Sequence, residues 1–180
     1  MAALNELLDS ASLRTLEAAA IARAGDDGWE LMQQAGQAAW ACLRQTWPQA
    51  TSVLVLAGPG NNGGDGYVLA RLALQDGHAV QVLALADAGP GTSLARRACA
   101  DYLAAGGVLL AYAGQLPRAD VVVDALFGLG FTRGPQAGLA ALIDQLNASG
   151  LPVLAIDVPT GVIGGTGAVP GVAVQAACTV

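Results

Sequence analysis

Three short stretches of the sequence combine residue types that could bind a ligand and do chemistry on it. They are AGPGNNGGDG at residues 57–66, DALFGLGFTRG at residues 124–134 and DVPTG at residues 157–161. Each follows an apolar run that is typical of a buried strand. Because ligands collect at the carboxyl ends of the strands in a parallel sheet, we expect the three stretches to form one site.

The glycines of the first two stretches favour a bound anion, most naturally a phosphate. Glycine removes the Cβ atom where the backbone turns sharply or approaches a ligand, and a helix that follows such a loop offers free N–H groups. Arg133 lies inside the second stretch, where a guanidinium is well placed to meet phosphate or an acidic partner. An ordinary surface arginine is the alternative.

Side chains with oxygen atoms occur in all three stretches, namely Asn61, Asn62, Asp65, Asp124 and Thr160. Amide, carboxylate and hydroxyl oxygens are hard ligands that suit an alkali or alkaline-earth cation and do not suit zinc. The chain contains no lysine that could otherwise offset the carboxylates. The alternative for each Asn or Asp is a helix cap or an Asx-turn.

Asp157 ends a nearly continuous apolar run, VLAID, and is followed closely by Pro159. Partial burial at this position would raise the pKa of the carboxyl group toward the range in which it can exchange protons with a substrate. We therefore predict a catalytic role for Asp157. A purely structural anchor for the turn is the competing interpretation.

The first stretch shares glycines with two common phosphate-binding motifs. The Walker motif needs Lys and Ser or Thr after its second glycine, but Gly63 is followed by Gly64 and Asp65. The dinucleotide fingerprint G-x-G-x-x-G is matched by Gly58, Gly60 and Gly63, with Asp87 as a possible ribose-binding acid. Asp65 opposes this second interpretation because a carboxylate weakens a helix end as a pyrophosphate site.

The elements that must position these residues alternate between short apolar runs and helical patterns from Ser52 onward. Expected strands are 52–58, 79–86, 107–111, 120–128 and 152–159, and expected helices are 64–76, 92–105 and 136–148. Two further helices are expected before residue 48. This pattern predicts an α/β fold with a mostly parallel sheet covered by helices on both faces and an N-terminal helical pair.

Composition excludes several classes of partner. The formal net charge is −6 with no basic cluster beyond Arg96 and Arg97, so we expect no nucleic-acid partner. No apolar run reaches the roughly 20 residues that a membrane span needs, and we expect no membrane association. The start of the chain lacks the pattern of a secretory signal, and the three cysteines are widely spaced among apolar residues. We therefore predict a cytoplasmic protein with reduced thiols.

The segments AGPGNNGGDGYVLAR, VVVDALFGLGFTRG and LAIDVPTGV resemble the three signatures of the NAD(P)H-hydrate epimerase family, the YjeF N-terminal domain. The segment SLRTLEAAAIARAGDDGWELMQQAG resembles the N-terminal helical pair of that family. The resemblance implies a Rossmann-like three-layer α/β/α sandwich. It also implies an isomerase that interconverts the R and S forms of NADHX and NADPHX at C6, as part of nicotinamide cofactor repair.

The resemblance also assigns residues. The substrate-binding segments of the family fall on Asn61, Asn62, Gly63, Gly64 and Asp65, on Gly128, Leu129, Gly130, Phe131, Thr132, Arg133 and Gly134, and on Asp157. The potassium site of the family falls on Asn62, Asp124 and Thr160, completed by backbone carbonyls. Thr160 stands where the family more often has serine, which keeps the hydroxyl oxygen and adds a methyl group.

The extent of the resemblance leads to two further expectations. Residues 1–180 form a single YjeF N-terminal-type domain that is truncated at its C-terminus, because AACTV looks like the opening of a further strand. In many bacterial members a C-terminal dehydratase domain follows, and the family likeness makes a homodimer plausible.

Asp157 is our choice for the proton shuttle of the epimerisation, in which the C6 hydroxyl leaves and water returns on the opposite face. Two other interpretations stay open at this point. One is a nicotinamide-dependent oxidoreductase, and the other is a catalytically silent module of the same fold that binds a nucleotide-like ligand or a protein.

Overall fold

The computed structural model describes residues 10–25, 27–85 and 89–180, which form a six-stranded parallel sheet with helices on both faces. The strands are β1 (Ser52–Ala57), β2 (Ala79–Ala84), β3 (Leu109–Ala111), β4 (Val121–Ala125), β5 (Val153–Ala155) and β6 (Cys178–Thr179). The helices are α1 (Ser10–Ala24), α2 (Trp29–Thr46), α3 (Asn61–Gln75), α4 (Ser93–Ala104) and α5 (Ala137–Ala148). The predicted α/β fold with a parallel sheet is confirmed.

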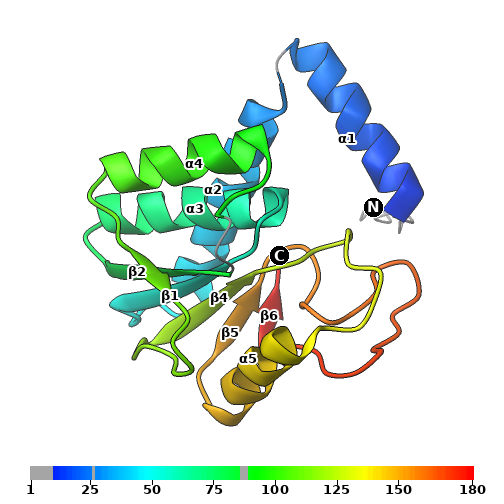
Figure 1. Cartoon of the computed structure of the whole chain (residues 1–180). Helices are drawn as coiled ribbons and strands as arrows, with labels where there is room; N and C mark the ends of the chain where they lie inside the picture. Colours follow the sequence, from blue (N-terminus) through cyan, green and yellow to red (C-terminus); the bar gives the residue numbers. More distant parts are fainter. Residues whose placement is uncertain (1–9, 26, 86–88) are drawn as a thin grey trace, which may run out of the picture.

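The strand order β3-β2-β1-β4-β5-β6 places a topological switch point between β1 and β4. From β1 the next strands along the chain, β2 and β3, are added on one side of the sheet. The chain then crosses back, and β4, β5 and β6 are added on the other side of β1 (Figure 1). Consecutive crossovers therefore diverge at the carboxyl ends of β1 and β4, which opens a crevice there for a ligand.

Alternate residues of the central strands face two different layers, as the period of a strand requires. Val53 and Val55 pack with α2, α3 and α4, whereas Leu54 and Leu56 pack with α5. Helices α2, α3 and α4 lie on one face of the sheet and α5 on the other (Figure 1). Since β1 and β4 are buried on both sides, their residues are mostly apolar and do not alternate with polar ones, and Asp124 is the one charged residue in the two strands.

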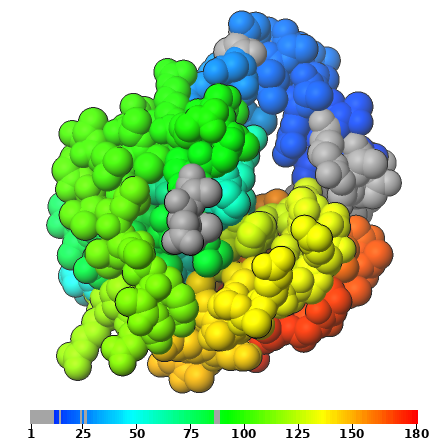
Figure 2. Space-filling view, in the orientation of Figure 1, coloured from blue at the N-terminus to red at the C-terminus, as the bar shows by residue number. Residues whose placement is uncertain are grey.

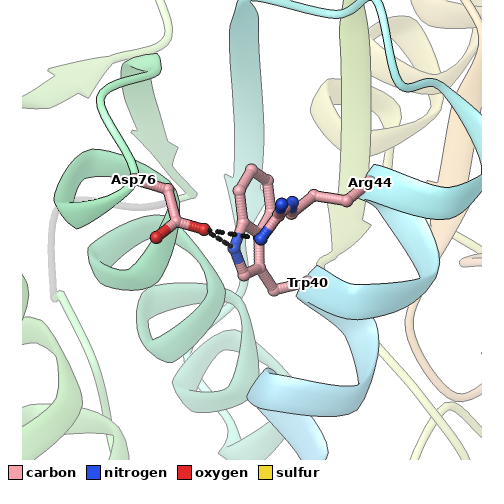
Figure 3. A network of polar contacts seen from close by, with 3 residues as sticks. All are labelled: Trp40, Arg44 and Asp76. Atoms are coloured by element: carbon pink, nitrogen blue, oxygen red, sulfur yellow. Dashed lines mark hydrogen bonds and ion pairs between the residues drawn. The ribbon is translucent and has the colours of Figure 1, made fainter.

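A polar cluster ties α2 to the carboxyl end of α3 (Figure 3). Asp76 Oδ2 accepts hydrogen bonds from Trp40 Nε1 at 2.8 Å and from the Arg44 guanidinium at 3.1 Å. This contact holds the helix α3 at the end opposite to its glycine-rich first turn.

The largest difference from the predicted elements concerns the glycine-rich stretch. We expected a loop up to Gly63 and a helix from Gly64, but α3 begins at Asn61 with Gly60 as its N-cap residue. The Gly64 N–H donates to the Gly60 carbonyl at 3.2 Å and closes the first turn. The first three residues of α3, which we placed before the helix, thus belong to it, and packing overrides the weak helix propensity of glycine.

The three cysteines are free thiols, as predicted. Cys42 of α2 and Cys178 of β6 nevertheless lie in contact, with 3.7 Å between their sulfur atoms. No helix among residues 10–25, 27–85 and 89–180 combines the length and apolar character needed to cross a membrane.

Candidate active site

The side chains of Asp124 and Thr160 meet directly behind the carboxyl end of β4. The Thr160 hydroxyl donates to Asp124 Oδ1 at 2.7 Å, and the Thr160 N–H donates to Asp124 Oδ2 at 2.8 Å. The Leu126 N–H also donates to Oδ1 at 3.2 Å. Both side chains are fully buried. Burial raises the pKa of Asp124 to about 6, although these three hydrogen bonds favour the charged form.

Replacing Thr160 by valine removes the hydroxyl at nearly constant volume. We expect Thr160→Val to lower the free energy of unfolding by about 2–3 kcal/mol, because Asp124 and the Phe127 N–H, which donates to the hydroxyl at 3.0 Å, both lose a buried partner. Thr160→Ser keeps both hydrogen bonds and loses only the methyl group. We expect it to lower the free energy of unfolding by about half as much as Thr160→Val, or less. Urea denaturation of both variants separates these outcomes, and equal losses would assign the effect to packing.

Asp157 has a left-handed backbone conformation, with φ of 69°, and it is the one non-glycine residue among those described with a positive φ. Its Oδ2 accepts a hydrogen bond from the Leu129 N–H at 2.7 Å, and its own N–H donates to the Val180 carbonyl at 2.8 Å. A Cβ atom at Gly128 would lie 2.0 Å from Asp157 Oδ2. A larger residue at position 128 would therefore displace the Asp157 carboxylate from its contact with the second stretch.

Asp157 is exposed as a residue, and surrounding groups nevertheless withdraw part of the water from its carboxyl, as we expected for this position. The pKa of its carboxyl is still raised, because surrounding protein groups displace part of its water, and the Leu129 hydrogen bond opposes this shift. A carboxylate that is accessible and also has a raised pKa is suited to proton exchange with a bound molecule.

Asp65, in the first turns of α3, is the second carboxylate of the site. Burial raises its pKa to about 8, with further contributions from repulsion by Asp157 and by Glu17 of α1. Asp157 thus lies close enough to Asp65 to oppose its ionisation. At neutral pH Asp65 holds a proton and can donate a hydrogen bond.

The shifted pKa of Asp65 predicts a pH-dependent stability. A carboxyl with a raised pKa in the folded state stabilises the fold below its unfolded pKa of about 3.9, and this contribution is lost as the pH rises toward 8. We expect Asp65→Asn to raise the free energy of unfolding at pH 8 by about 2–5 kcal/mol and to change it little at pH 4. Denaturant titrations at both pH values check this, and a gain of equal size at pH 4 would contradict it.

The first turn of α3 presents backbone N–H groups that have no carbonyl partner within the helix. Gly58 and Gly63 allow this turn to lie close to the strand ends, since a Cβ at Gly63 would be 2.0 Å from the Gly58 carbonyl oxygen. The arrangement fits the predicted anion site.

The two asparagines differ in their surroundings. Asn61 Oδ1 accepts a hydrogen bond from the Thr92 hydroxyl at 2.7 Å and so faces the start of α4. The Asn62 amide is buried, and neither its oxygen nor its nitrogen has a hydrogen-bond partner within the described part of the chain. A buried amide without a partner calls for a ligand, which is the observation expected of a cation donor.

The remaining residues of the second stretch line the wall of a groove. Gly130, Phe131, Thr132, Arg133 and Gly134 border a groove of about 870 Å³ that also reaches Pro59 of the first stretch. Arg133 is exposed and forms no ion pair with any residue that the structure describes. Asp87, the ribose-binding acid of the dinucleotide fingerprint, lies outside the described residues.

The structure thus brings most of the predicted residues to one edge of the sheet. Asp124 bonds to Thr160, Asp157 bonds to the second stretch, and Asp65 interacts with Asp157. Asn62 forms no hydrogen bond with Asp124 or Thr160 among the described contacts. Sequence reasoning missed the groove walls formed by β3 and Tyr112, and the backbone groups of Leu126 and Phe127. No residue-type signal identifies a backbone donor, so only the fold could reveal the latter.

Comparison with known proteins gives consistent matches. The family described as YjeF-related protein N-terminus matches residues 28–180. The chain is 42% identical over 153 residues to the bifunctional NAD(P)H-hydrate repair enzyme Nnr of Escherichia coli, covering 84% of this chain and 30% of that protein. It is 40% identical over 166 residues to the NAD(P)H-hydrate epimerase of Rhodobacter capsulatus, covering 88% and 78%.

Two further relatives extend the match. The NAD(P)H-hydrate epimerase of Limosilactobacillus fermentum is 34% identical over 177 residues, with 97% of this chain and 84% of that protein covered. The crystal structure of yeast ynu0 superposes with a TM-score of 0.81 at 22% identity, over 97% of this chain and 79% of that one, and shows the same fold. The family match and the identities of 34–42% over most of the sequence show that the chain belongs to the YjeF-related N-terminal domain family.

Proposed function

We propose that the chain is an NAD(P)H-hydrate epimerase that interconverts the R and S forms of NADHX and NADPHX in nicotinamide cofactor repair. The names of its relatives in Rhodobacter capsulatus and Limosilactobacillus fermentum support this proposal. The observation that carries it is the exposed Asp157 carboxylate, which lies within electrostatic reach of Asp65 in the first turns of α3.

The chemistry requires the C6 hydroxyl to leave and water to add to the opposite face. The lone pair of the ring nitrogen expels the hydroxyl, and Asp157 supplies the proton with which it departs as water. The resulting iminium is attacked at C6 by a water molecule, and Asp157 takes a proton from that water as the new C–O bond forms. Protons and electrons balance over the cycle, and no redox partner is needed.

Other groups bind and orient the substrate in this proposal. Backbone N–H groups of Asn61, Asn62 and Gly63 at the start of α3 receive the pyrophosphate. Asp65, protonated at neutral pH, donates a hydrogen bond without repelling the phosphates. The N–H of Leu129 keeps the Asp157 carboxylate aimed into the site.

We further propose a potassium ion held by Asn62, Asp124 and Thr160. The donor set fits, because it consists of amide, carboxylate and hydroxyl oxygens and because the buried Asn62 amide has no protein partner among the described residues. When bound, the cation supplies a fixed positive charge that offsets the carboxylates beside the substrate.

Three features of the whole protein are also part of the proposal. A homodimer is supported by exposed apolar side chains on the first two helices, Leu16 at 53% and Leu31 at 36% exposure. A cytoplasmic location is supported by the free thiols. A dehydratase domain in the full-length protein is supported by the bifunctional name of the Escherichia coli relative, of which this chain spans 30%.

The direct test is to incubate the protein with R-NADHX in potassium buffer and to follow the S epimer by chromatography. We expect conversion well above the spontaneous rate, and at least a tenfold slower reaction in lithium, because a smaller ion fits the same oxygen donors poorly. Hydride transfer with intact NAD(H) would instead indicate an oxidoreductase. Binding without turnover would indicate a silent module.

A further inference from the structure

A groove of about 870 Å³ extends from the ends of β2 and β3 to the loop after β4, and none of the proposed proton transfers takes place in it. One wall is the end of β3 with Tyr112, and the other is formed by the loop after β4 and the start of α5. In Figure 2 the green segments and the yellow loop after β4 lie on the same face of the molecule. The volume is in the range of small-molecule sites.

The groove continues from the candidate active site but does not include its carboxylates. Pro59 and residues 130–134 belong to both regions, whereas Asp65, Asp124 and Asp157 do not line the groove. A ligand whose reacting group lies at Asp157 can therefore extend past the first turn of α3 into the groove. Asp157 follows β5, whereas the groove runs from the loop after β4 across to the ends of β2 and β3.

Aromatic side chains are concentrated in this groove. The chain has only two phenylalanines, and both line it, together with Tyr112. The rings of Phe127 and Phe131 are 5.4 Å apart between centroids, inclined at 45°. The Tyr112 hydroxyl donates to Gln145 Oε1 at 3.0 Å, and Gln145 in turn donates to the Gly114 carbonyl, so the tyrosine ring is held in place. Phe131 is buried, and Phe127 and Tyr112 are partly buried, so the exposed parts of Phe127 and Tyr112 form an aromatic wall against which a flat base can pack.

The charge of the lining favours an anionic ligand. Arg133 is the one charged side chain among the described lining residues, and no acidic residue lies among them. Its guanidinium has no ion-pair partner in the part of the chain that the structure describes. A phosphate carried by the ligand can therefore pair with Arg133.

We propose that this groove binds the adenosine end of the NAD(P)HX dinucleotide, with the adenine against the aromatic wall and Arg133 facing a phosphate. The assignment rests on the proposed function. A dinucleotide bound at a switch point lies across it, so that a hydrated nicotinamide at Asp157 directs the adenosine to the β2–β3 side. The first turn of α3 lies between the two ends and receives the pyrophosphate.

A large side chain introduced at Gly138 would fill this groove. It is the second residue of α5, it lines the groove, and no atom lies within 4 Å of the position of an added Cβ. Gly138→Trp therefore adds bulk to the groove without a clash at the backbone. Ala141→Trp is the matched control, because Ala141 is exposed on the same helix and does not line the groove. Ala111→Trp fills the groove from the opposite wall and guards against a folding defect specific to Gly138→Trp.

The experiment measures binding of 5′-AMP and nicotinamide mononucleotide by NMR titration, and KM and kcat for NADHX. We expect Gly138→Trp and Ala111→Trp to weaken 5′-AMP binding and to raise KM at least tenfold, with nicotinamide mononucleotide affinity and kcat within twofold of the unmodified protein. Ala141→Trp is expected to change none of these. The assignment would be overturned if both groove variants fold and bind 5′-AMP unchanged, or if they lose nicotinamide mononucleotide binding instead. Epimerase activity of the unmodified protein would still support the proposed function in either case. Absence of that activity counts against the proposed function alone, since the 5′-AMP titration reports on the groove independently.

Discussion

Asp157→Asn is expected to lower the rate of epimerisation by about 10²–10⁴-fold, the range that a positioned general acid and base contributes. Asparagine is well suited to isolate this effect. It tolerates the left-handed backbone of Asp157, and its side-chain oxygen can still accept the hydrogen bond from the Leu129 N–H. The variant therefore loses the ability to exchange a proton but keeps the backbone conformation and the hydrogen bond to Leu129.

Stability distinguishes a catalytic role for Asp157 from a structural one. Because the pKa of Asp157 is raised and Asp65 lies within its electrostatic reach, a neutral amide should leave the melting temperature unchanged or increase it at pH 7. Asp144→Asn, at an exposed position on α5, is the control and should keep full activity. Full epimerase activity in Asp157→Asn would assign the proton transfer to another group, whereas a large loss of melting temperature would assign Asp157 to the turn.

Gly58→Ala is expected to destabilise the fold by about 3–5 kcal/mol and to lower the melting temperature by roughly 10 °C. A Cβ at Gly58 would lie 1.8 Å from the Leu126 carbonyl oxygen, a backbone atom that cannot move aside. The Gly58 N–H also donates to the Ala125 carbonyl at 3.0 Å, which joins the ends of β1 and β4. Separating these strand ends would move the first turn of α3 away from Asp124 and Asp157, so activity should fall together with stability.

Gly60→Ala provides the matched control for stability, because Gly60 has an ordinary φ of −87° and no atom within 4 Å of an added Cβ. Its melting temperature should stay within about 2 °C of the unmodified protein, as for a surface change without a structural cause. Thermal unfolding followed by circular dichroism measures both variants. Equal melting temperatures for Gly58→Ala and Gly60→Ala would show that the β1–β4 contact at Gly58 can relax.

The pattern of the sequence predicted each element of the sheet from Ser52 onward, but not its boundaries. The run 120–128 contains β4, yet the strand ends at Ala125. Its last residues turn away because the Leu126 and Phe127 N–H groups bond to Asp124 and Thr160 and not to a neighbouring strand. Residue patterns report which side chains are apolar, whereas strand ends depend on where backbone groups find partners.

The sequence by itself determined the fold class and the residue types of the site, since apolar periodicity and glycine spacing act locally along the chain. Tertiary structure alone decided which of these residues touch. The bond between Asp124 and Thr160 spans 36 residues, the repulsion between Asp65 and Asp157 joins two separate crossovers, and the aromatic groove combines β3 with the loop after β4. Such contacts arise from the order of strands in the sheet, and the pKa of each carboxyl follows from how much water its neighbours displace, so neither can be read from a pattern along one strand or helix.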